Sequence, residues 1–173
     1  MIRREHTKGD APSHAVYSAD ERYRYDLVRV WDEAGPRANF LMLNPSTATE
    51  ARNDPTVERC ERRARALGFG AFRVTNIFAL RATDPRRMRA DPEPVGRPEN
   101  DRAILEAARW ADAVVCAWGT HGAHLDRGAE VEAMLRGAGH RLLCLGLSKA
   151  GHPKHPLYIP YAEQPQPWEP PCP

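Results

Sequence analysis

Asn76 is the residue whose type and position most suggest chemistry. It interrupts an otherwise apolar segment, FRVTNIFAL, at residues 72–80. An amide buried there without a partner would cost about 1–3 kcal/mol. A side-chain amide both donates and accepts hydrogen bonds, which suits the amide or imide edge of a nucleobase. The alternative is a structural asparagine that bonds to neighbouring backbone.

A second candidate is the loop with the sequence HPKHP, which carries His152, Lys154 and His155. Two imidazoles and an ammonium group close together disfavour one another's protonation. A neutral histidine can then donate a hydrogen bond to an oxygen that gains negative charge in a transition state. Metal binding is the competing interpretation, with His121 and His124 as further ligands. Two histidines without a nearby carboxylate or thiolate form a poor ligand set, however.

The third candidate is the tetrapeptide NPST at residues 44–47. Asparagine, proline and serine are ordinary turn residues, so the segment could be a plain turn. The functional interpretation is that it holds the Asn44 amide and backbone N–H groups over a reacting centre.

Strands and helices along the chain must position these residues. Alternation of apolar and charged residues predicts one or two half-buried strands over residues 23–33. Short apolar runs predict strands buried on both faces; they cover residues 39–43, 72–80, 113–118 and 141–147. Asp54-Pro55 predicts a helix start, and the helices are expected over residues 54–67, 99–111 and 126–135. Residues 83–98, rich in proline and charge, are expected to form a loop.

Strands that alternate with helices predict an α/β fold. We expect a three-layer sandwich with a central, mainly parallel four-stranded sheet and an added N-terminal strand or hairpin. Residues 1–173 would form a single domain, in which residues 1–20 and 161–173 are loosely ordered extensions.

Ligands of an open α/β sheet bind outside the carboxyl ends of its strands. Polar residues that follow the four apolar strands are therefore expected at one edge of the sheet. They are Asn44, Ser46, Asn76, Arg81, Trp118, His121, Ser148, His152, Lys154 and His155.

The composition excludes several classes of protein. Of the 173 residues, 42% are hydrophobic, which favours a folded core. No apolar run approaches the roughly 18 residues of a membrane span, and no signal-peptide pattern opens the chain, so we expect a cytoplasmic protein. The four cysteines form no CxxC pair, and no dinucleotide-binding, P-loop or GxSxG motif occurs.

Only three of the 25 basic residues are lysines, and the others are arginines. Arginine suits the binding of phosphates, but a GC-rich genome produces the same bias towards arginine.

The order of motifs carries a resemblance. The segments LMLNPSTA, DPTVERC, NIFALRATDP and GHPKHPLY closely resemble the DUF1643 family over about residues 23–158. More distantly, the same order resembles the uracil-DNA glycosylase superfamily. Its members carry a catalytic Asp or Asn after the first strand, a base-reading Asn on the next, and a histidine–proline loop after the last.

The second resemblance implies a fold like that of uracil-DNA glycosylases and a set of roles. Asn44 would position the attacking water, and Asn76 would pair with the base edge. His155, with His152 as the alternative, would hydrogen-bond the base oxygen as the leaving group becomes anionic. The remaining residues expected around the substrate are Ser46, Arg81, Trp118, His152 and Lys154. No metal and no cofactor are expected.

The sequence thus predicts an enzyme that acts on the N-glycosidic bond of a nucleobase, in DNA or in a nucleoside or nucleotide. A rival is a non-catalytic sensor that binds a nucleobase or nucleotide in the same pocket. A third option is a metal-dependent hydrolase that uses the histidines. No membrane and no obligatory protein partner is expected.

Overall fold

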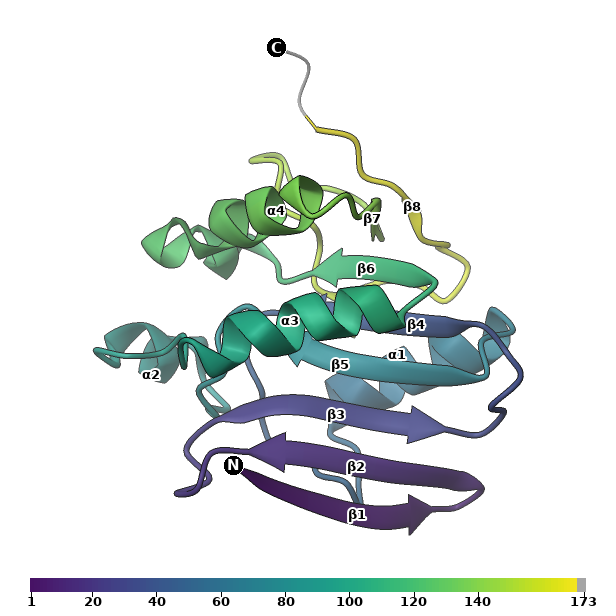
Figure 1. Cartoon of the computed structure of the whole chain (residues 1–173). Coiled ribbons are helices and arrows are strands. Elements are labelled where there is room, and N and C mark those ends of the chain that lie inside the picture. Colours follow the sequence, from purple (N-terminus) through teal and green to yellow (C-terminus); the bar gives the residue numbers. More distant parts are fainter. Residues whose placement is uncertain (171–173) are drawn as a thin grey trace.

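The computed structural model describes residues 1–170, which form one mixed eight-stranded sheet flanked by helices (Figure 1). The strand order is β1-β2-β3-β5-β4-β6-β7-β8. The strands are β1 (Ile2–Lys8), β2 (Ala11–Tyr17), β3 (Arg24–Val30), β4 (Arg37–Met42), β5 (Ala71–Asn76), β6 (Ala113–Ala117), β7 (Leu142–Cys144) and β8 (Gln166–Pro167). The four central strands β5, β4, β6 and β7 are parallel, which confirms the predicted core of the sheet.

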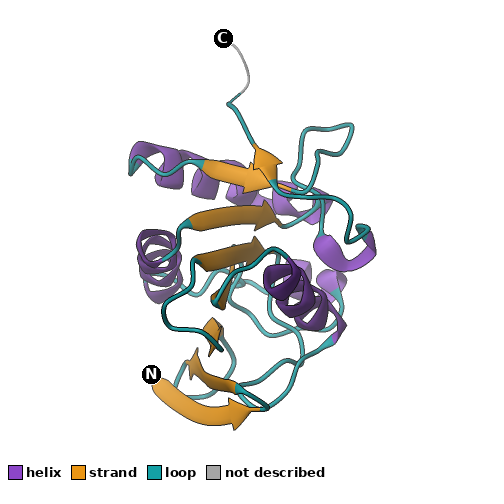
Figure 2. Ribbon diagram, turned by 90° about the vertical axis from the view of Figure 1, so that its right-hand side faces the viewer, coloured by secondary structure: helices purple, strands orange, loops and turns teal. Residues whose placement is uncertain are grey.

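Helices cover both faces of the sheet (Figure 2). They are α1 (Pro55–Ala66), α2 (Pro85–Ala90), α3 (Glu99–Trp110) and α4 (Arg127–Gly137), with 3-10 turns η1 (Thr120–Asp126) and η2 (Pro156–Tyr158). Helix α1 packs Val57 and Cys60 against one face of the sheet, in a cluster with Phe40. Helices α3 and α4 pack on the opposite face, where Ile104 and Val131 lie in the other main cluster.

The N-terminal residues differ from the prediction of a loose extension. Residues 2–17 form an antiparallel hairpin, and β2 pairs with β3, so the sheet extends by two strands. Strand β2 buries every second side chain, including Ala11, Ala15 and Tyr17. This alternation was missed because alanine and serine give a weak period-two signal. Gly9 supplies the positive φ that the hairpin turn needs.

Further boundaries differ, and the strand expected over residues 141–147 covers only Leu142–Cys144. The segment 83–98, expected to be a loop, contains the six-residue helix α2, which starts at Asp84-Pro85 with the same capping signature as α1. Strand β5 ends at Asn76 rather than at residue 80; beyond it, the Ile77 N–H donates to the carbonyl of Met42 at the end of β4, and the Phe78 N–H donates to the carbonyl of Leu43.

The C-terminal tail, expected to be loose from residue 161, adds the short edge strand β8 beside β7. Trp168 is buried there, with its ring centroid 5.5 Å from that of Trp118. Residues 171–173 of the predicted extension lie outside the described part of the chain. None of the helices within residues 1–170 is long and apolar enough to cross a membrane.

Candidate active site

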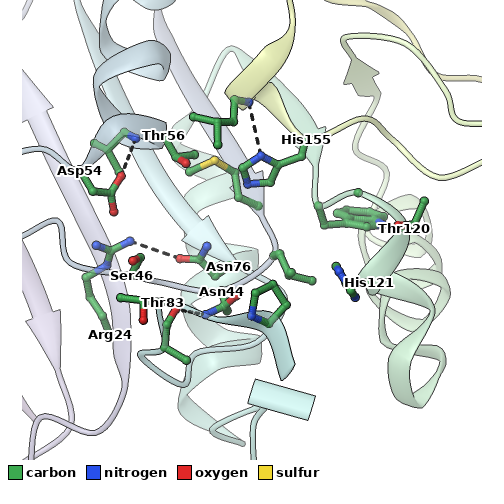
Figure 3. A pocket seen from close by; sticks show the side chains of 18 residues that line it. Arg24, Asn44, Ser46, Asp54, Thr56, Asn76, Thr83, Thr120, His121 and His155 are labelled. Atoms are coloured by element: carbon green, nitrogen blue, oxygen red, sulfur yellow. Dashed lines mark hydrogen bonds between the residues drawn. The ribbon is translucent and has the colours of Figure 1, made fainter. Parts of the chain in front are cut away.

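A cavity of about 370 Å³ lies at the carboxyl ends of β4, β5 and β6 (Figure 3). This is the size range of small-molecule sites. Its polar wall consists of Arg24, Asn44, Ser46, Asp54, Thr56, Asn76, Thr83, Thr120, His121 and His155. Apolar side chains complete it, among them Met42, Val57, Pro85 and Leu157. Residues far apart in the sequence therefore surround one space.

Asn76 closes strand β5 and is 2% exposed. Its Oδ1 accepts a hydrogen bond from Arg24 Nη2 at 3.4 Å, and its Nδ2 has no partner among residues 1–170. A structural asparagine would satisfy that donor, since an unpaired buried N–H is costly. The wall of the cavity therefore contains a buried amide donor that no described residue satisfies.

Arg24, at the start of β3, holds this part of the wall. The side chain is 1% exposed, and its Nη1 donates to the Ala48 carbonyl at 2.8 Å. Burial lowers the pKa of Arg24 to about 10, so the guanidinium stays charged at neutral pH. It orients the Asn76 amide and ties down the loop after β4.

Asn44 follows β4 directly, and backbone contacts fix its amide. Nδ2 donates to the carbonyls of Pro45 at 3.0 Å and of Ala82 at 2.8 Å. All hydrogen bonds of the side chain within the described residues use this nitrogen. Oδ1 is therefore the atom left to accept a hydrogen bond from a ligand or a water molecule.

His155 lies across the cavity as a neutral imidazole. Burial lowers its pKa below the usual 6.5, against the attraction of Asp54. Its Nδ1 accepts a hydrogen bond from the backbone N–H of Leu157 at 3.3 Å. The proton of the neutral ring therefore sits on Nε2, which can donate to a ligand. The loop itself is held where Gly119 N–H donates to the Pro153 carbonyl at 2.7 Å.

Asp54 is both the N-cap of α1 and part of the cavity wall. Oδ1 accepts from Val57 N–H at 2.9 Å, and Oδ2 accepts from Ala48 N–H at 3.1 Å. The sequence predicts the capping role correctly but not the carboxylate's place in the cavity.

Ser46 and Trp118 also line the cavity, as predicted for substrate contacts. The Trp118 indole is buried where Gly122 and Gly128 leave room for it; a Cβ at Gly122 would lie 2.2 Å from the Trp118 ring.

Three predicted substrate residues do not line this cavity. The Arg81 guanidinium donates to the Glu21 carbonyl and lies 5.2 Å from the centre of the Tyr17 ring. The His152 backbone N–H donates to Ser148 Oγ, and the Lys154 side chain runs along Gly146. The HPKHP loop thus presents only His155 to the cavity.

Several lining residues escaped the sequence-based prediction. Arg24 belongs to an alternating strand in which arginine is typical of the solvent face. His121 was expected at this edge of the sheet and as a possible metal ligand but was given no substrate contact, and Thr56 was expected only as part of a helix. Within the described residues, no three side chains of His, Cys, Asp or Glu gather as a metal site would require.

Comparison with known families gives one match. The profile of the family described as "Protein of unknown function (DUF1643)" covers residues 24–157. No curated protein and no solved structure matches the chain.

Proposed function

The chain belongs to the DUF1643 family, and we propose that it is a metal-independent enzyme that cleaves the N-glycosidic bond of a nucleobase. The substrate is a nucleobase in DNA or in a nucleoside or nucleotide. The fold we propose is of the uracil-DNA glycosylase type. Its support is the order of the motifs and their position at the carboxyl ends of the parallel strands.

One observation carries the proposal. Asn44, Asn76 and His155, from three separate loops or strand ends, line one cavity, and each has a polar side-chain atom without a hydrogen-bond partner among the described residues. The set comprises a donor on Asn76 Nδ2, an acceptor on Asn44 Oδ1 and a donor on His155 Nε2. A flat heterocycle with carbonyl oxygens complements this arrangement, and the apolar wall suits its faces.

The chemistry follows from where charge develops. Cleavage of the glycosidic bond leaves positive charge on the sugar and negative charge on the departing base. Donors that act on the base oxygens stabilise the transition state more than the ground state. In the proposed site the His155 and Asn76 N–H groups supply them. Asn44 Oδ1 accepts a hydrogen bond from the attacking water and so orients it towards the sugar carbon.

The test is release of free base from a panel of uracil-, hypoxanthine- and hypermodified-base DNAs, nucleosides and nucleotides. We expect one of these classes to turn over without added metal. Asn76→Ala should lower kcat/KM by about 10- to 100-fold, the equivalent of one lost hydrogen bond to a buried partner. Its melting temperature should fall, because the buried Arg24 guanidinium loses the Asn76 Oδ1 acceptor, so kcat/KM is measured at a temperature at which the variant is fully folded. No base release from any substrate, or full turnover by Asn44→Ala, would contradict the proposal.

A nucleobase or nucleotide sensor is the second candidate. It is favoured by the contacts of Asn44, whose amide nitrogen donates to the carbonyls of Pro45 and Ala82. These are the contacts of an asparagine that stabilises a turn, and they require no catalytic role for it. Thermal-shift titration separates the two functions. Stabilisation by nucleobases or nucleotides without any product would identify the sensor.

A further inference from the structure

We infer that Asp54 is a catalytic residue of this site: its carboxylate accepts the proton of the attacking water. This inference rests on the proposed glycosidic cleavage and assigns the group that removes the proton. Asn44 can orient a water molecule but cannot take its proton, because an amide is not a base at neutral pH. Asp54 supplies the single carboxylate among the described residues that line the cavity.

The buried carboxylates of the protein differ in how their charge is balanced. Asp26 forms an ion pair with Arg73 at 2.7 Å, and Glu61 forms ion pairs with Lys8 and Arg65. Asp54 is 8% exposed yet forms no ion pair within residues 1–170. Burying an unpaired charge is costly.

Two backbone N–H groups and the positive end of α1 hold the Asp54 charge in place. Each carboxylate oxygen has a second lone pair, so these contacts leave acceptor capacity on the cavity side. The site therefore keeps a preorganised negative charge that no cation neutralises by direct contact.

Asp54 also acts on the other polar groups of the cavity. Its charge raises the pKa of Arg24 and of His155, in each case against the larger effect of burial. The carboxylate thus lies within electrostatic reach of the group that orients Asn76 and of the group that faces the leaving base. A sugar bound between them would place its positive charge beside the carboxylate.

The step balances as follows. The water oxygen forms a bond to the sugar carbon while the bond from that carbon to the base nitrogen breaks, and its electron pair leaves with the base. The water proton passes to a carboxylate oxygen of Asp54. His155 Nε2–H donates a hydrogen bond to the anionic base, which then takes up a proton through solvent. Asp54 returns its proton to solvent, and the products are the free base and a sugar hydroxyl.

The experiment uses Asp54→Asn and Asp54→Ser. Asparagine and serine cap helices about as well as aspartate, so both variants remove the charge and keep the bond to Val57 N–H, although a single oxygen cannot also accept from Ala48 N–H. Asp84→Asn is the matched control, because Asp84 caps α2 in the same Asp-Pro context but does not line the cavity. Single-turnover release of base is measured on the substrate that the wild type cleaves, with binding of the free base as a second readout.

We expect both Asp54 variants to release base at least about 100-fold more slowly, the usual contribution of a general base. Base affinity should change little, and Asp84→Asn should match the wild type. Near-wild-type turnover by a folded Asp54→Asn or Asp54→Ser would overturn this inference and leave the proposed function standing. A wild type without base release on any substrate would overturn both.

A measurement independent of turnover checks the geometry. In Asp54→Asn, the pKa of His155 followed by NMR should fall further, because the attraction of the carboxylate is lost. An unchanged pKa would show that the Asp54 charge does not reach the imidazole, which contradicts the inference.

Discussion

Arginines serve different purposes in the buried interior and at the N-terminal hairpin. Four arginines are at most 1% exposed and donate to main-chain carbonyls of other segments: Arg24, which lines the cavity, and Arg29, Arg63 and Arg127, which do not. On the hairpin, Arg3 and Arg4 are exposed and pair with Glu5 and Glu21. The buried arginines thus hold main-chain segments in place, whereas the arginines of the hairpin lie on the surface.

The difference depends on whether the main-chain carbonyls of each region already have hydrogen-bond donors. The hairpin pairs its carbonyls in the sheet ladder or, along the outer side of the edge strand β1, leaves them to solvent, whereas irregular loops at the carboxyl ends of the strands have no ladder. A guanidinium has five N–H donors in a rigid fork, so one side chain can satisfy several loop carbonyls. Arg29, for instance, bonds the carbonyls of Thr49 and Glu50 and the side chain of Asn53. The abundance of arginine therefore has a structural use that neither phosphate binding nor genome composition requires.

Arg29→Leu gives the largest effect expected from this contrast. It removes the hydrogen bonds to Thr49, Glu50 and Asn53 and leaves their partly buried acceptors without this donor. We expect the free energy of unfolding to fall by about 3–5 kcal/mol, as when one partner of a buried charged network is removed. Urea denaturation measures it. A loss of unfolding free energy below about 1 kcal/mol would mean that water replaces the guanidinium and that the loop at residues 49–53 does not depend on Arg29.

An intermediate effect is expected from His155. Burial lowers its pKa in the folded protein, so below about pH 6.5 the unfolded chain binds the proton more readily than the folded one. The stability that this group contributes is complete above that pH and is lost as the pH falls towards the folded-state pKa. The slope is at most about 1.4 kcal/mol per pH unit.

Urea unfolding at about pH 7.5 and about pH 5.5 tests this dependence. His155→Asn should lose less stability on acidification than the wild type. His6→Asn, on the exposed hairpin strand β1, is the control and should behave like the wild type. Equal pH dependence in all three proteins would show that His155 is not held neutral by the fold.

Arg4→Ala on the hairpin gives the smallest effect. Its ion pair with Glu21 is half exposed, and such pairs contribute about 0–1 kcal/mol. We expect a change in the free energy of unfolding of less than about 0.5 kcal/mol, and less still at high salt. A loss comparable to that of Arg29→Leu would remove the distinction between the two regions.

Local patterns predicted much of the framework. Apolar runs indicated the parallel strands, and Asp54-Pro55 indicated the start of α1. The rule that ligands bind at the carboxyl ends of strands indicated that Asn44, Asn76 and His155 would meet. These signals work because they depend on neighbouring residues or on a general property of parallel sheets.

An added N-terminal strand or hairpin was expected, but neither its formation by residues 2–17 nor the role of Arg24 was predictable in this way. The buried positions of β2 include alanine and serine, which differ little in hydropathy from their more exposed neighbours. Nothing in the sequence around Arg24 shows that this arginine is buried. Both depend on partners distant in the sequence.

By itself, the sequence determined the α/β alternation, the helix caps and the polar groups available at the ends of the strands, because each follows from short-range pattern. Only the tertiary structure decided which atoms of those groups face the cavity. The carbonyl of Ala82, 38 residues away, joins that of the adjacent Pro45 in occupying Asn44 Nδ2, which leaves Oδ1 to accept from a ligand, and Arg24 orients the Asn76 amide. The path of the loop after β4 makes the cap residue Asp54 part of the site. Hydrogen bonds between distant segments set these orientations, and no local sequence pattern encodes them.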